Sequence, residues 1–97
     1  MPFRHVMIFE IDESAEKFEV DRAFQHAGEL LRSIPGVFNQ SGGPTVNPFA
    51  DVRRYGMMVE FRTLDDFRFY VTHSNHKAAI NAIRPYNKSA MNVMLEI

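Results

Sequence analysis

Residues 3–11 read Phe-Arg-His-Val-Met-Ile-Phe-Glu-Ile. Apolar side chains fall on both the odd and the even positions of this stretch, which indicates a β-strand with apolar residues on two faces. Helices packed on one side of a sheet cover only one of those faces. The stretch therefore predicts a second, uncovered apolar face, which is unusual for a monomer in water.

The next segment predicts a helix and a second strand. Asp12-Glu13-Ser14 supplies turn and N-cap chemistry, and apolar residues then recur at helical spacing from Phe18 to Ile34. Pro35-Gly36 ends this helix. Val37-Phe38 opens a second strand that reaches about Ser41 or a little beyond.

A long loop is expected over residues 41–54, because this segment holds two Gly and two Pro and has no periodicity. Loops of this length in compact domains often act as lids. Phe49 lies in its middle, and either a ligand or a partner chain would cover that side chain. Arg53 and Arg54, at the loop's end, are either solvated or face an anionic ligand.

The C-terminal half predicts a third strand over residues 55–62, a helix capped by Thr63, a further helical segment capped by Ser74 and stopped by Pro85, and a final strand over residues 87–97. The order is β-α-β-β-α-β, the ferredoxin-like α+β arrangement in one domain, residues 1–97. A four-stranded antiparallel sheet would carry two helices on one face. Residues predicted to point to the other face are Val6, Ile8, Phe38, Met58 and Met94.

Composition narrows the class of protein. Eleven basic and twelve acidic residues are scattered along the chain, which argues against nucleic acid as a partner. The chain has no cysteine, so neither disulfides nor thiolates can reinforce or catalyse. The absence of a signal-peptide pattern and of a membrane-spanning stretch predicts a soluble, cytoplasmic protein. At this length a partner surface is the expected reinforcement.

Four stretches at this order and spacing resemble the stress-responsive A/B barrel (Dabb) family. They are His5-Val-Met-Ile-Phe9, Ile34-Pro-Gly-Val37, the strand that ends at Phe61, and Tyr70-Val-Thr-His73-Ser-Asn-His76. The family commonly has proline where this chain has Ser74, and both residues suit a helix start. The resemblance implies a homodimer in which two sheets form an α/β barrel.

The resemblance also implies candidate site residues. A plant relative is a cofactor-free polyketide cyclase whose Tyr and His, at positions matching Tyr70 and His76, work beside a strand histidine matching His5. In such a site, neutral His76 would move a proton and the Tyr70 hydroxyl would stabilise an oxyanion. The alternative is structural, with His73 and His76 capping helix ends, Tyr70 in the core and His5 bonded to a core acceptor.

Three functions stay open at this point. The first is binding of a small apolar organic molecule between sheet and helices, without a cofactor. The second is a cofactor-independent cyclase or lyase that uses His76, Tyr70 and His5, and the third is an oligomerisation module without a ligand. Residues predicted to line the cavity are Met7, Phe9, Phe24, Tyr55, Met57, Phe67, His73 and Ile80. No metal site is expected, since no carboxylate completes a metal-binding signature with the histidines.

Overall fold

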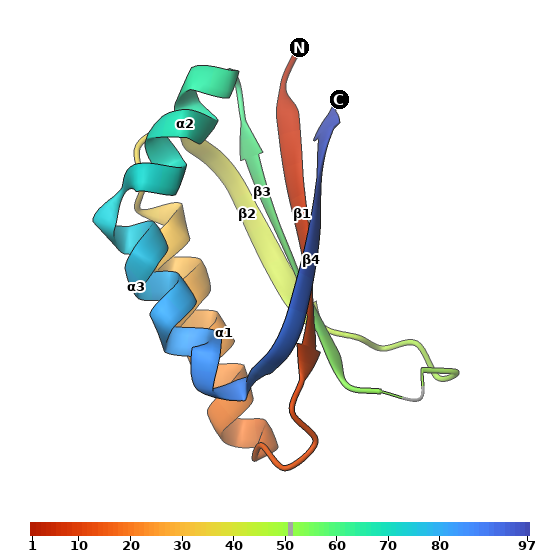
Figure 1. The fold of residues 1–97 in the computed structure, drawn as a ribbon. Coiled ribbons are helices and arrows are strands. Elements are labelled where there is room, and N and C mark those ends of the chain that lie inside the picture. Colours follow the sequence, from red (N-terminus) through yellow and green to blue (C-terminus); the bar gives the residue numbers. More distant parts are fainter. Residues whose placement is uncertain (51) are drawn as a thin grey trace.

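The computed structural model describes residues 1–50 and 52–97, and within these ranges the elements follow the predicted order (Figure 1). The strands are β1 (Phe3–Ile11), β2 (Val37–Pro44), β3 (Arg54–Phe61) and β4 (Asn87–Glu96). They form an antiparallel sheet in the order β2-β3-β1-β4. One face of the sheet carries α1 (Lys17–Arg32), α2 (Leu64–Thr72) and α3 (Ser74–Ile83), and a 3-10 turn at Arg84–Tyr86 connects α3 to β4. The predicted ferredoxin-like α+β fold is confirmed.

The two faces of β1 are as the alternation predicts. His5 and Phe9 are buried toward the helices, whereas Ile8 is 40% exposed on the other side. Val6 lies opposite Met58 of β3 and Val93 of β4, and residues directly opposite in an antiparallel sheet share a face.

The face predicted for Met94 is wrong. Met94 lies opposite His5, so it faces the helical layer. Side chains alternate between the two faces along a strand, so Met94 points away from the face that carries Met91, Val93 and Leu95. We call the resulting apolar surface the open face; it consists of Val6, Ile8, Met58, Met91, Val93 and Leu95.

Phe38 lies at an irregularity of β2, between Val37 and Asn39, where the register with β3 shifts. Its ring is 43% exposed, and the Arg62 guanidinium lies 4.9 Å from the ring centroid. A cation over an aromatic face is a favourable contact, so Arg62 partly covers this ring.

The hydrophobic core lies between the sheet and the helices. α1 contributes Val20, Phe24, Ala27 and Leu31 to a cluster that includes Met57, Val59 and Phe61 of β3, and Tyr70 of α2 is completely buried in it. Within the described ranges, none of the helices has the length and apolarity of a membrane-spanning helix.

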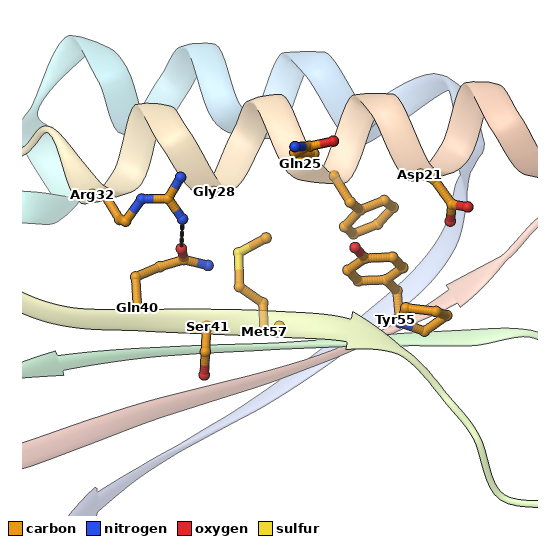
Figure 2. Close-up of a pocket in the computed structure, with 11 residues that line it drawn as sticks. Asp21, Gln25, Gly28, Arg32, Gln40, Ser41, Tyr55 and Met57 are labelled. Carbon is orange, nitrogen blue, oxygen red and sulfur yellow. Dashed lines mark hydrogen bonds between the residues drawn. The ribbon is translucent and has the colours of Figure 1, made fainter.

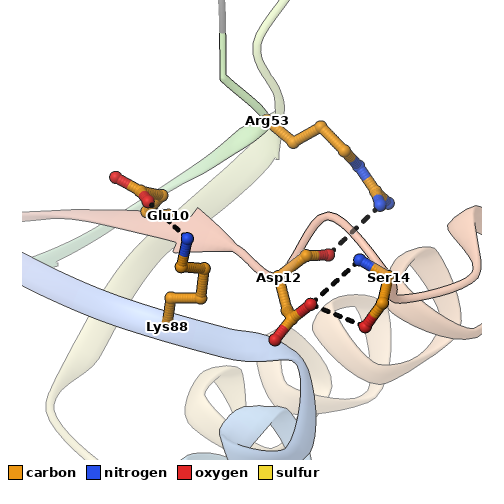
Figure 3. Close-up of polar contacts among 5 residues, drawn as sticks. All are labelled: Glu10, Asp12, Ser14, Arg53 and Lys88. Carbon is orange, nitrogen blue, oxygen red and sulfur yellow. Dashed lines mark hydrogen bonds and ion pairs between the residues drawn. The ribbon is translucent and has the colours of Figure 1, made fainter.

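The ends of α1 differ from the prediction. Asp12 and Ser14 form a tight turn, in which the Asp12 carboxylate accepts from the Ser14 backbone N–H and hydroxyl (Figure 3). These two bonds are the main reason that the pKa of Asp12 lies below its usual value. Glu16 caps the helix instead, by accepting from the N–H of Glu19 at 2.9 Å. After α1, Gly36 adopts a φ of +98°, which favours glycine.

The predicted loop over residues 41–54 is shorter than expected, because β2 continues to Pro44. Proline is tolerated there since β2 is an edge strand. Residues 45–50, which follow it, lie beyond the end of the sheet and away from the helices (Figure 1). Arg53 ties the end of the loop to the turn before α1 by donating to the carbonyl oxygens of Asp12 and Ala15, and Lys88 pairs nearby with Glu10 (Figure 3).

The helical segment after β3 is broken at His73, whose backbone is extended, with φ −72° and ψ 142°. Thr63 caps α2 as predicted, by accepting from the N–H of Asp66. The predicted cap at Ser74 is wrong, because His73 caps α3: its Nδ1 accepts from the N–H of Asn75 at 3.0 Å. An imidazole nitrogen with a lone pair can serve the function that a hydroxyl usually serves at this position.

Candidate ligand-binding site

A pocket of about 290 Å³ lies between α3 and the strands β1 and β4. Its polar side chains include His5 and His76, and its apolar wall is formed by Met7, Phe9, Ile80 and Ile83. We call it the histidine pocket. Its volume is near the lower end of the range for small-molecule sites, and its mixture of apolar walls and a few polar groups is typical of them.

β4 leaves the histidine pocket open because it is an edge strand. Ala90 and Asn92 of β4 face the helical side, opposite Phe9 and Met7, but both are exposed. The helices thus cover the centre of the sheet better than this edge.

His5 projects into the histidine pocket from β1. Its Nε2 lies 3.1 Å from Oδ1 of Asn92, and its ring meets Phe67 edge-on at 5.4 Å. Because an amide oxygen only accepts, Nε2 carries the proton and Nδ1 is an acceptor. Nδ1 is buried and has no hydrogen-bond partner among residues 1–50 and 52–97. Leaving a buried acceptor unpaired costs free energy.

His76 projects from α3 and contacts Tyr70. Their ring centroids are 4.7 Å apart, at an interplanar angle of 65°. Burial, and secondarily the charge of His5, lowers the pKa of His76 below its usual 6.5. His76 is therefore mainly neutral at pH 7 and can accept a proton.

Tyr70 lies beneath His76, and burial raises the pKa of its phenol well above the usual value. The hydroxyl is therefore protonated at neutral pH, and it has no hydrogen-bond partner in the described parts of the chain. No hydrogen bond therefore joins the Tyr70 hydroxyl to His76 in the part of the chain that the structure describes. A cavity of about 30 Å³ borders both rings and shares Met7, Phe9 and Ile80 with the histidine pocket, and it has room for a water molecule.

The structure brings together part of the predicted site. His5, His76, Met7, Phe9 and Ile80 line the histidine pocket, and Tyr70 adjoins it through the smaller cavity. The other predicted residues lie elsewhere.

Phe67 packs against the His5 ring. His73 caps α3, and its ring lies against Phe69. Phe24 and Tyr55 stack on each other in a separate groove between α1 and β2, and Met57 borders both that groove and the small cavity.

Asn92 lines the histidine pocket and contacts His5, and it was not among the predicted site residues. It is a polar residue among the apolar residues of β4 and lies on the side of the strand that faces the helices, where its amide is hydrogen-bonded to His5. If the register of β4 against β1 had been known, the position of Asn92 opposite Met7 would have shown that this polar side chain faces the helices. The described residues contain no group of three or more acidic, His or Cys side chains that could hold a metal ion.

A family model described as the Stress Responsive A/B Barrel Domain (Dabb) matches residues 3–94. This chain belongs to the Dabb family. The match covers β1 through most of β4, and the family resemblance seen in the sequence is confirmed.

Some solved structures similar to this Dabb chain are enzymes, and others are proteins of unknown function. A dimeric ferredoxin-like protein of unknown function from Thermobifida fusca has a TM-score of 0.88 and 23% identity, covering 100% of this chain and 92% of its own. The hydroxynitrile lyase of Passiflora edulis has a TM-score of 0.84 and 15% identity, with 99% and 93% covered.

SnoaB, a cofactor-independent oxygenase from Streptomyces nogalater, has a TM-score of 0.79 and 14% identity, with 99% and 92% covered. Comparison with curated protein sequences finds no match. At these identities the structural likeness establishes the fold, and the Dabb fold is common to proteins of different activity.

Proposed function

We propose that two copies of this chain pair through their open faces and that each binds a small, largely apolar organic molecule in its histidine pocket. The observation that carries the binding proposal is a pocket in which the imidazoles of His5 and His76 lie beside an apolar wall. The pairing proposal is supported by the exposed apolar surface and by similar structures that are described as dimeric.

The pocket chemistry favours a ligand with one hydroxyl or N–H group on an apolar body. The polar group would bond to the imidazole of His76, which lines the pocket and is mainly neutral. The apolar body would contact Met7, Phe9 and Ile80. Burying such a body against these side chains supplies most of the affinity, while the imidazoles fix its orientation.

Binding can be tested with the fluorescent dye 1-anilinonaphthalene-8-sulfonate and an Ile80→Trp variant. Ile80 lines the pocket and is 42% exposed, so the larger side chain fills the pocket without disturbing the core. We expect the dye affinity to fall at least about tenfold, the loss from blocking a pocket that buries most of a ligand.

The matched control is Val71→Trp, because Val71 is 40% exposed on α2 and lines none of the described pockets. This variant should bind the dye as the parent chain does. Equal affinity of Ile80→Trp and the parent would contradict ligand binding in the histidine pocket. If the Ile80→Trp variant does lose affinity, mass spectrometry of small molecules that stay bound to the parent protein through purification would identify its natural ligand.

A second candidate function is acid–base catalysis in the same pocket. It is favoured by the contact between Tyr70, a protonated buried phenol, and His76, a neutral imidazole. The activities printed for two similar structures, a hydroxynitrile lyase and a cofactor-independent oxygenase, support it. If a retained compound is converted by the parent protein and His76→Ala binds it without converting it, the chain is an enzyme. Binding without turnover by the parent protein indicates a binding protein.

A further inference from the structure

A groove of about 350 Å³ runs between α1 and the edge strand β2 (Figure 2). We call it the α1–β2 groove. It lies on the helical side of the sheet, opposite the open face, and it shares no lining residue with the histidine pocket. Pairing through the open face would leave it accessible.

The groove exists because β2 presents little side-chain volume toward α1. By register with Val59, Met57 and Tyr55, the helix-facing positions of β2 are Gln40, Gly42 and Pro44. A Cβ on Gly42 would lie 2.5 Å from the carbonyl oxygen of Gly56, so the close approach of β3 requires glycine here and this position adds no side chain to the groove. At one end Gln40 reaches across to α1, where a Cβ on Gly28 would lie 3.1 Å from the Gln40 amide nitrogen. Gly28 thus allows Gln40 to close this end of the groove.

The floor of the groove is aromatic and apolar. Phe24 and Tyr55 stack with ring centroids 4.1 Å apart, and Met57 lies beside them (Figure 2). Burial, and to a lesser degree Asp21, raises the pKa of the Tyr55 phenol, which remains a neutral donor. Aromatic rings and a polarisable thioether favour a flat, apolar ligand body.

The two ends of the groove differ in charge. At one end Arg32 Nη1 donates to Oε1 of Gln40 at 2.7 Å (Figure 2), and within the described ranges no carboxylate pairs with this guanidinium. At the other end Asp21 is paired with Lys17 at 2.7 Å. The net charge lining the groove is therefore positive near Arg32, and its planar guanidinium matches a carboxylate.

We infer that the α1–β2 groove binds a small aromatic carboxylate, with the carboxylate on Arg32 and the ring against Met57 and the part of the Tyr55 side chain that Phe24 leaves uncovered. This site is independent of the proposed function, since it takes a different ligand class at residues outside the histidine pocket. The bond from Arg32 to neutral Gln40 holds the guanidinium in place without neutralising it. The ordering cost that an exposed arginine pays on binding is reduced accordingly.

The inference can be tested by NMR titration of the full chain with 2-naphthoate and with 2-naphthol, which has the same rings but is uncharged at pH 7. We expect 2-naphthoate to shift the backbone amide signals of Gly28, Gln40 and Gly42. The affinity for 2-naphthol should be at least about fivefold weaker, as expected for one charge-assisted contact at a partly exposed site.

An Arg32→Gln variant should bind the two compounds about equally. Arg22→Gln is the matched control, because Arg22 is also exposed on α1 but lies outside the groove. It should keep the preference for 2-naphthoate. The inference would be overturned if 2-naphthoate shifted only signals of α3 and β4, or if Arg32→Gln still preferred 2-naphthoate to 2-naphthol. The Ile80→Trp variant separates this site from the histidine pocket. It should leave the shifts of Gly28 and Gly42 unchanged whether or not the histidine pocket binds a ligand.

Discussion

His76 links the candidate site to the stability of the fold through its protonation. Its pKa is lowered in the folded chain by burial and by His5, whereas in the unfolded chain it returns to about 6.5. Below that pH the unfolded chain binds a proton more readily than the folded chain, so the free energy of unfolding must fall. This contribution is complete above about pH 6.5 and is lost as pH decreases through the folded-state pKa.

We therefore expect the free energy of unfolding of the parent chain to decrease more between pH 7 and pH 5 than that of His76→Gln. Urea denaturation at several pH values measures the free energy of unfolding of both proteins. The titration of distant carboxylates affects both equally, so it cancels in the difference between them. His26→Gln is the control, because His26 is exposed on α1 and should leave the slope unchanged. Identical pH dependence in the parent and His76→Gln would show that burial does not control this imidazole.

The sequence predicts some site residues and not others for a geometric reason. The inward direction of His5, Met7 and Phe9 follows from the period of two along one strand. Tyr55 also faces the helices as its alternation indicates, yet it lies in the α1–β2 groove. Whether two inward residues share a cavity depends on strand order and register, which single-strand periodicity does not contain.

At the scale of elements, α3 carries His76 and Ile80, and its first turn depends on His73. The Nδ1 of His73 satisfies the N–H of Asn75, one of the donors that a helix start leaves unpaired. We expect His73→Ala to lower the free energy of unfolding by about 1 kcal/mol, the usual cost of losing an N-cap. Urea denaturation near pH 7.5 measures this loss.

Two further variants make that prediction specific. Asn at position 73 is a good capping residue, so His73→Asn should retain most of the stability. Ser74→Ala should change it little, because Ser74 follows the cap rather than serving as it. A larger loss for Ser74→Ala than for His73→Ala would reverse the assignment.

Element boundaries were predicted well where one strong signal decides them. Phe3–Ile11 is a strand over its whole predicted length, and Thr63 caps α2. β2 was predicted too short because Gly and Pro are normally loop signals, whereas pairing with β3 extends the strand to Pro44. Ser74 was predicted as the cap of α3 because serine usually takes this position, whereas His73 was named as a cap only in the structural alternative, which the structure bears out for this residue.

At the scale of the whole molecule, the open face is the feature that one copy of the chain leaves uncovered. Met91 and Val93 are 66% and 49% exposed, and Ile8 and Leu95 lie beside them. One charged group on this side, Glu60, is already buried and paired: it accepts from Arg4 at 2.6 Å and from Asn39 at 2.9 Å. These bonds, first that of Asn39, lower the pKa of Glu60, so pairing of two sheets would cover a carboxylate whose hydrogen bonds are already satisfied.

Val93→Asp tests pairing through this face. In a two-fold dimer the substitution introduces a carboxylate from each copy into the same apolar contact, and each would lose water without gaining a partner. We expect the dissociation constant of the dimer to rise at least about a hundredfold, as a desolvated charge costs several kcal/mol. Sedimentation velocity over a range of concentrations measures it.

Asn81→Asp is the matched control, since it adds the same charge on the exposed surface of α3 and should leave the dimer intact. Because Val93 is half exposed in a single copy, Val93→Asp should keep its secondary structure, which circular dichroism checks. Its thermal stability should no longer depend on protein concentration, whereas that of the parent chain should rise with concentration, because association stabilises only the folded form. A Val93→Asp protein that sediments as the parent does would place the contact between copies on another surface.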